Sequence, residues 1–164
     1  MAKKKDKKSG MISVNQTVAD NPRARFDYHL EDKFEAGIML VGTEVKSLRL
    51  GQASIKESHV VVKKGELWLL NSNIPEYQQA GHLNQHPPKR ERKLLLHKKE
   101  VDKLMGAVSR EGYTIVPTRL FFNGRGLAKI EIALAKGKKL YDKRETEKAR
   151  DWGREKHKIL KEKK

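Results

Sequence analysis

The residues YTIVPTRLFF (113–122) and LAKIEIAL (127–134) decide the fold, because they form two strand-like runs around the turn Asn123-Gly124-Arg125-Gly126. β-Branched, aromatic and other apolar residues alternate with polar ones along both runs, which is typical of strands. The Asn-Gly pair suits turn positions with φ > 0. The sequence therefore predicts a β-hairpin over residues 113–134.

Further strand-like runs precede this hairpin. SHVVV (58–62) and ELWLLN (66–71) flank the turn Lys63-Lys64-Gly65-Glu66, which predicts a second hairpin. Residues 26–39 are predicted to hold two strands broken near Lys33, and Leu94 to Leu96 adds a short apolar run.

Two segments have helical patterns. TEVKSLRLG (43–51) is predicted to be a short helix capped by the Thr43 hydroxyl and stopped by Gly51. Residues 97–112 carry a helical apolar stripe, and residues 75–88 are expected to form an exposed loop or a short irregular helix. Short strands with about three short helices over residues 11–135 favour a mainly β domain. We expect a closed antiparallel barrel, since closure removes exposed strand edges.

The charge of the chain predicts a polyanionic partner. Lys and Arg exceed Asp and Glu by 37 to 21, which gives a net charge of +16 and a pI near 10.0. Residues 1–10 hold five lysines and one aspartate, and we expect this segment to be disordered. Residues 136–164 hold 13 basic and 6 acidic residues with few apolar ones, so this tail is expected to be disordered when free and helical on a partner.

Several function classes find no support in the residues. No cysteine is present, no apolar run is long enough to span a membrane, and no secretory signal follows the basic start, which together predict a cytoplasmic protein. His82 and His86 lack a third metal ligand, and Gly137-Lys138-Lys139 lacks the glycine that starts a phosphate loop. We therefore expect no metal, no cofactor and no catalytic site.

Basic and aromatic residues lie at the ends of the expected strands, where a small barrel binds nucleic acid. Before the first strands come Arg23 and Arg25, with Phe26 and Tyr28. The candidates at later strand ends are Arg90, Arg92, Lys93, Lys136, Lys138 and Lys139.

Particular strings resemble a known family. These are FEAG (34–37), GTEVKSLR (42–49), RKLLLH (92–97), VPTRLFF (116–122) and IALAKGKKLYDKRE (130–145). In this order they resemble the SsrA-binding proteins, also called small protein B, which bind transfer-messenger RNA (tmRNA). The resemblance implies an OB-like barrel that is a monomer, binds the tRNA-like domain of tmRNA and stands where an anticodon arm would be. It also implies delivery with elongation factor Tu to stalled ribosomes for peptide tagging and ribosome rescue.

The resemblance also implies roles for individual residues. It places tmRNA contacts at Glu35, Leu95 and His97, where His97 replaces an asparagine of some members. It sends the tail into the decoding centre and empty messenger path of the small ribosomal subunit, through Asp142, Lys143, Arg144, Trp152, Ile159 and Leu160. Phe26 occupies a position where many members have a histidine that faces the decoding centre, and a phenyl ring can stack but cannot hydrogen bond. Two alternatives stay open: a general rRNA-binding ribosomal protein, and a small nuclease using His97 or the Glu31–Glu35 carboxylates.

Overall fold

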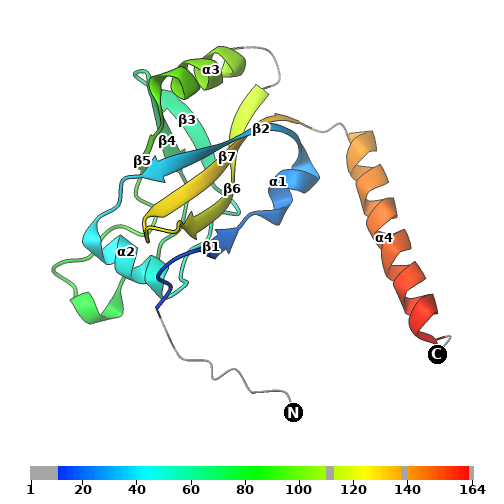
Figure 1. Cartoon of the computed structure of the whole chain (residues 1–164), viewed down its shortest axis with the longest axis horizontal. Coiled ribbons are helices and arrows are strands. Elements are labelled where there is room, and N and C mark those ends of the chain that lie inside the picture. The colour runs from blue at the N-terminus through cyan, green and yellow to red at the C-terminus, as the bar shows by residue number, and fades with distance from the viewer. Residues whose placement is uncertain (1–10, 110–112, 138–139, 163–164) are drawn as a thin grey trace.

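The computed structural model describes residues 11–109, 113–137 and 140–162, with only the backbone for residues 140–143, 146 and 159–162. The described residues form one antiparallel sheet and four α-helices (Figure 1). The strands are β1 (Gln16–Asp20), β2 (Tyr28–Ile38), β3 (His59–Lys63), β4 (Glu66–Leu70), β5 (Arg92–Leu95), β6 (Tyr113–Phe122) and β7 (Ala128–Gly137). The helices are α1 (Pro22–Asp27), α2 (Gly42–Arg49), α3 (Lys98–Val108) and α4 (Leu140–Glu162), with a 3₁₀ turn η1 (Gln78–Ala80).

The strand pairings return to their starting point. β6 pairs with β3, and the sheet continues through β4, β5, β2 and β7, which pairs with β6 again. β1 is added to β6 beside β3. Both predicted hairpins, β3–β4 and β6–β7, are therefore confirmed, and they supply two consecutive parts of this ring of pairings.

The main core lies on the inner face of these strands. Leu67 and Leu69 of β4 alternate with less buried neighbours, and Ile130 and Ile132 of β7 face the same interior. Helices α2 and α3 each bury one leucine there, Leu48 and Leu104. Leu104 belongs to the stripe predicted for residues 97–112, so that helix is confirmed over Lys98–Val108, whereas its predicted end at Gly112 lies outside the described residues.

Helix α1 covers the other side of the β6–β7 pair. Ala24 is buried against Val116 of β6 and Ala135 of β7, with Tyr28 packed at the edge of this small cluster. The sequence interpretation missed this helix and placed a strand from residue 26, which is wrong because α1 runs to Asp27. Pro22 at the helix start is compatible with its missing N–H.

Two further local predictions are corrected. Strand β2 is continuous from Tyr28 to Ile38, with a register shift between Leu30 and Lys33 instead of a break. In the β6–β7 turn the residue with positive φ is Gly126, because the Asn123 side chain folds back and accepts hydrogen bonds from two backbone amides of the turn.

The start of α2 also differs from the prediction. The helix begins after Val41, whose backbone N–H donates to the Glu44 carboxylate at 2.9 Å. The Thr43 hydroxyl lies 2.8 Å from Nδ1 of His86, so it does not cap the helix.

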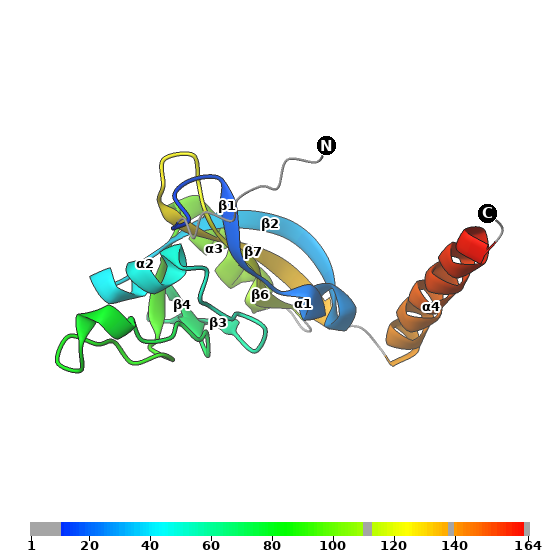
Figure 2. The same ribbon diagram turned by 90° about the horizontal axis from the view of Figure 1, so that it is seen from below.

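Helix α4 stands beside the sheet domain on the side of α1 (Figures 1 and 2). The helical part of the tail prediction agrees with it, whereas disorder in the free protein stays a prediction. Lys136, counted with the tail in the sequence, lies on β7. The predicted disorder of residues 1–10 and the roles given to Lys138 and Lys139 concern residues outside the described ones. Among the described residues, no helix is both long and apolar enough to cross a membrane.

Candidate RNA-binding surface

Strands β2 and β5 bring two of the predicted contacts to one outer face. Along β5, Leu94 is buried in the core while Leu95 is 50% exposed. On β2, Ala36 is buried and Glu35 is exposed, and Gly37 is the register partner of Leu95. Because strand side chains alternate between the two faces, Glu35 and Leu95 both point outward.

Gly37 stands opposite Leu95 at a close approach of the two strands. A Cβ atom at position 37 would lie 3.2 Å from the Leu95 Cβ, which is closer than such atoms normally approach. The missing side chain leaves the leucine unobstructed on its strand. An exposed apolar side chain is thereby presented beside a carboxylate.

His97 is held near this face by the start of α3. It is the residue that precedes the helix, and its carbonyl oxygen accepts the backbone N–H groups of Glu100 and Val101, each at 3.0 Å. The imidazole is exposed. Glu35, Leu95 and His97 thus offer an acceptor, an apolar contact and a hydrogen-bonding ring on rigid elements.

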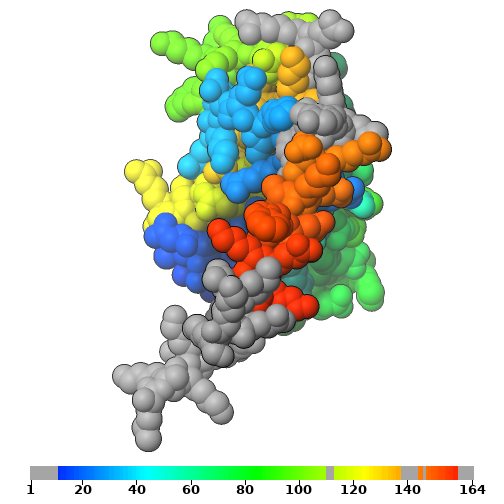
Figure 3. All heavy atoms as spheres, turned by 90° about the vertical axis from the view of Figure 1, so that its right-hand side faces the viewer, coloured from blue at the N-terminus to red at the C-terminus, as the bar shows by residue number. Residues whose placement is uncertain are grey.

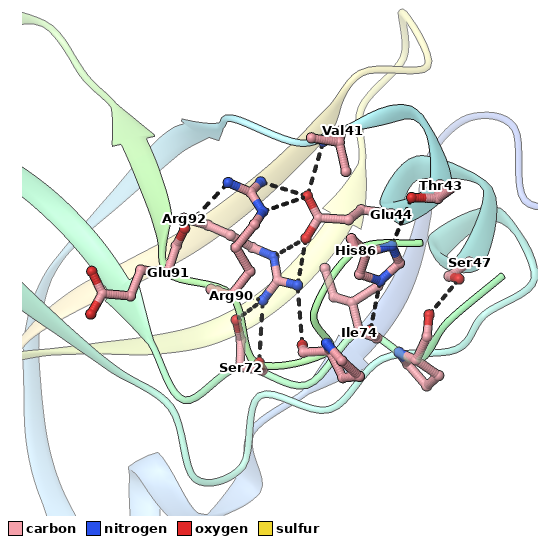
Figure 4. Close-up of polar contacts among 12 residues, drawn as sticks. Val41, Thr43, Glu44, Ser47, Ser72, Ile74, His86, Arg90, Glu91 and Arg92 are labelled. Atoms are coloured by element: carbon pink, nitrogen blue, oxygen red, sulfur yellow. Dashed lines mark hydrogen bonds and ion pairs between the residues drawn. The ribbon is translucent and has the colours of Figure 1, made fainter. Parts of the chain in front are cut away.

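A buried ion pair links strand β5 to helix α2 on the side opposite the exposed face (Figure 4). The Arg92 guanidinium donates to the Glu44 carboxylate of α2 at 2.5 Å, and neither side chain is exposed. Arg92 also donates to the Ser72 hydroxyl at 2.8 Å and to the Pro88 carbonyl at 3.1 Å. Arg90 reaches the other Glu44 oxygen and the Met39 carbonyl, which lies just beyond β2.

Electrostatics keep this cluster charged. Burial by itself raises the pKa of Glu44, but hydrogen bonds from Arg90 and the Val41 amide, with the positive charge of Arg92, hold that pKa below its ordinary value. Burial lowers the pKa of Arg92 more than Glu44 raises it, yet a guanidinium stays protonated in proteins. The sequence suggested Arg90 and Arg92 as candidates for nucleic acid, but Arg92 is buried and Arg90, which is 31% exposed, is paired with Glu44.

Most of the other predicted RNA contacts lie away from this face. Lys93 points outward on β5, but its ammonium is paired with Glu66 at 2.9 Å. Arg23 and Arg25 are exposed on α1, at the opposite end of β2. Tyr28 and Lys136 lie at that same end, where the Lys136 ammonium is 5.8 Å from the centre of the Tyr113 ring. The structure thus divides the predicted RNA contacts between the β2–β5 face and the α1 end.

The predicted ribosome contacts lie on α1 and α4. Phe26 is half-buried on α1, and the Arg150 guanidinium of α4 lies 5.5 Å from its ring centre. Trp152 is 64% exposed and Arg144 is exposed. Asp142, Lys143, Ile159 and Leu160 lie within α4, but their side chains are outside the described part.

Three of the groups considered for metal or acid–base chemistry have other partners. Both ring nitrogens of His86 are occupied, by the Thr43 hydroxyl and the Ile74 carbonyl, each at 2.8 Å. Asp32 is paired with Lys103 at 2.9 Å, and Glu31 accepts the Tyr113 hydroxyl at 3.1 Å. Within the described ranges, no three metal-ligating side chains come together.

Sequence reasoning missed the residues that support the site. Glu44 and Gly37 stand in recognised strings, but nothing local says that the glutamate is buried against strand β5 or that the glycine faces Leu95. It also missed the cations Lys33 and Arg119, which lie around Glu131 on the outer side of β2, β6 and β7.

Comparison with known proteins gives a consistent set of relatives. The family model of the SmpB protein matches residues 18–162. The SsrA-binding protein of Nitrobacter winogradskyi is 62% identical over 145 residues, which cover 88% of this chain and 92% of the relative. The SsrA-binding protein of Afipia carboxidovorans is 58% identical over 155 residues, which cover 94% of this chain and 96% of the relative.

A solved structure agrees with these sequence relatives. It is described as "tmRNA-SmpB: a journey to the center of the bacterial ribosome", and its matching chain is 47% identical with a TM-score of 0.61. The match covers 74% of this chain and 84% of the solved one.

Proposed function

The chain belongs to the SmpB protein family, and from this premise we propose that it binds tmRNA and acts in trans-translation on the ribosome. The observation that carries the proposal is the outer face of β2 and β5, where exposed Leu95 lies opposite Gly37 and next to Glu35. The buried Glu44–Arg92 ion pair holds strand β5 in place, so this face is already formed in the absence of RNA. No catalytic role is assigned to the protein.

The chemistry of this face suits a folded RNA loop. Leu95 can pack against a sugar or an unstacked base, and the Glu35 carboxylate can accept from a base amino group or a ribose 2′-hydroxyl. His97 can donate or accept a further hydrogen bond. Such contacts give selectivity, because contacts to phosphate alone carry no sequence information.

The basic residues supply affinity. Arg23, Arg25 and Lys136 are exposed at the α1 end, near Tyr28, and contact phosphates there. Lys93 joins them when RNA phosphate competes with Glu66 for its ammonium. Lys138 and Lys139 follow Lys136 in the sequence and extend the same charge.

The remaining assignments follow family membership. The protein acts as a cytoplasmic monomer, occupies the place of an anticodon arm and enters the ribosome with elongation factor Tu and tmRNA. We interpret the ring of strand pairings as a closed, OB-like barrel. The basic composition of residues 136–164 supports a tail that is disordered when free and becomes helical in the messenger path.

In the ribosome, the tail and α1 contact the small subunit. Phe26 and Trp152 supply aromatic faces for stacking, and Asp142, Lys143, Arg144, Ile159 and Leu160 complete the decoding-centre contacts. Phe26 cannot make the polar contact of a histidine at its position, so stacking is its contribution.

The test compares two leucine variants. Binding of the tRNA-like domain of tmRNA and of an elongator tRNA is measured for the unchanged chain, Leu95→Ala and Leu83→Ala; Leu83 is a fully exposed control in the loop before β5. We expect preference for tmRNA, a loss of about tenfold for Leu95→Ala and no loss for Leu83→Ala. Equal binding of both RNAs by the unchanged chain would instead favour a general rRNA-binding protein.

A further inference from the structure

Four cationic side chains from four different elements converge on a hollow of about 470 Å³ beside α1. They are Arg25 of α1, Lys33 of β2, Arg119 of β6 and Arg150 of α4. Figure 3 shows α4, in orange and red, in front of the sheet domain, and Arg150 of this helix lines the hollow. We call this feature the α1–α4 hollow.

The carboxylates in the α1–α4 hollow do not balance its cations. Glu131 is shared, since its two oxygens lie 3.6 Å from the Lys33 ammonium and 3.7 Å from the Arg119 guanidinium. One of these oxygens also accepts the Thr118 hydroxyl at 2.9 Å. Asp20 is the second carboxylate, and it accepts the Asn21 backbone N–H at 3.0 Å. Four cations therefore face two carboxylates.

Two of the guanidinium groups make cation–π contacts with aromatic rings beside the hollow. Arg119 lies 4.2 Å from the centre of the Phe121 ring, and Arg150 lies 5.5 Å from that of Phe26. A cation–π contact leaves the charge of a guanidinium in place, and its N–H donors can still bind phosphate oxygens two at a time.

From this arrangement we propose that the α1–α4 hollow is a phosphodiester-binding site, in which the RNA backbone bridges the sheet domain and helix α4. When α4 lies against α1, Arg150 adds its charge to that of Arg25, Lys33 and Arg119, and these like charges repel. A phosphodiester neutralises the excess and draws the four groups together. Phosphate binding and the docking of α4 are therefore coupled, and each strengthens the other.

The hollow adjoins the Glu35–Leu95–His97 face, since Glu131 is the register partner of Glu35, but none of those three residues lines it. The inference deepens the proposed function and rests on it, since trans-translation supplies the RNA. It adds a specific consequence: RNA that enters the hollow fixes the direction in which α4 leaves the domain.

The test uses the full chain and a short oligouridylate as the probe. Side-chain Nε–H signals of the arginines are followed by NMR during the titration. We expect the Arg25, Arg119 and Arg150 signals to move together with one dissociation constant. The matched variants are Arg119→Gln and Arg125→Gln, which remove the same charge; Arg125 is exposed in the β6–β7 turn, away from the hollow.

Arg119→Gln should weaken oligouridylate binding about tenfold and Arg125→Gln less than about twofold. Lys33→Gln should act like Arg119→Gln, and it decides the question if the arginine variant fails to fold. Equal losses for the hollow and control variants, or an Arg150 signal that does not move with Arg119, would overturn the inference.

Binding of the tRNA-like domain of tmRNA is measured on the same proteins. If tmRNA binds but the NMR signals of the hollow arginines do not change with oligouridylate, the phosphodiester site is wrong while the proposed function stands. If the arginines respond but tmRNA is not preferred over an elongator tRNA, the proposed function fails and the phosphodiester site stands.

Discussion

Glu44 and Arg92 form an ion pair in which neither side chain is exposed to solvent, although they lie 48 positions apart in the chain. Glu44 belongs to α2 and Arg92 begins β5, so the pair ties a helix to the strand that presents Leu95. A buried charge whose partner is removed is strongly unfavourable. The exposed leucine therefore depends on a residue pair that is buried on the other face of its strand.

Replacing Arg92 with methionine should destabilise the fold. The Glu44 carboxylate would stay buried with only Arg90 and a backbone amide as partners, and we expect a loss of about 3 kcal/mol in the free energy of unfolding. Urea unfolding measures it. The matched control is Lys63→Met, which breaks the exposed pair with Glu91 and should cost less than about 1 kcal/mol. Equal losses would contradict the account.

The same carboxylate should make stability depend on pH. The pKa of Glu44 lies below its ordinary 4.5 in the folded protein, so the unfolded chain binds its proton more tightly. The resulting stability is fully present above about pH 4.5 and is lost as the pH falls through the lowered pKa. Unfolding free energies measured across this range should fall less steeply for Glu44→Gln than for the unchanged chain. A parallel fall would show that other carboxylates cause the acid sensitivity.

Adding a methyl group at Gly37 should weaken tmRNA binding. The new Cβ would press on the Leu95 Cβ at 3.2 Å and displace the leucine from its place on β5. We expect affinity to fall about fivefold in Gly37→Ala, measured by filter binding with the tRNA-like domain. Gly42→Ala is the control, because its added Cβ would meet no more distant part of the chain within 4 Å. An unchanged affinity in Gly37→Ala would remove Leu95 from the contact.

Position 97 should tolerate an amide. His97 ends in hydrogen-bonding nitrogens on an exposed ring at the start of α3, and asparagine offers both a donor and an acceptor. His97→Asn should therefore retain tmRNA affinity, whereas His97→Ala should lose about 1 kcal/mol of it in the same filter-binding assay. If both variants bind like the unchanged chain, the ring makes no contact.

The tail should be separable from tmRNA binding. Deleting residues 142–164 should leave binding of the tRNA-like domain largely intact and abolish tagging of peptides on stalled ribosomes. Trp152→Ala should reduce tagging in the same way without loss of stability, because the indole is already 64% exposed. Stacking of one base on an aromatic side chain contributes about 1–3 kcal/mol to the binding free energy, which the variant would lose. Normal tagging by the truncated chain would show that the tail has no role in it.

Much of the sheet could be predicted because its signals are local. The two hairpins follow from apolar runs on either side of glycine-containing turns, and α3 follows from its apolar stripe. Helix α1 has six residues, too few for a periodic pattern, and its single inward residue is Ala24. Pro22 was the one signal for its start.

The residues of the β2–β5 face were predicted only because they lie in strings that resemble the SsrA-binding proteins. Leu95 and Glu35 were found in recognised strings, and the alternation of buried and exposed residues then placed them outward. The Glu44–Arg92 pair could not be found in this way, because charges in a helix and a strand are usually solvated. The convergence of Arg119 and Arg150 likewise depends on how distant elements pack.

The central claim is that this chain selects tmRNA from the RNAs of the cell. The most direct measurement is sequencing of the RNA recovered with the tagged full-length protein, beside the same protein carrying Leu95→Ala. The account predicts one dominant tmRNA species with the unchanged chain and its depletion with the variant. Recovery of ribosomal RNA in stoichiometric amounts, without enrichment of tmRNA, would contradict it.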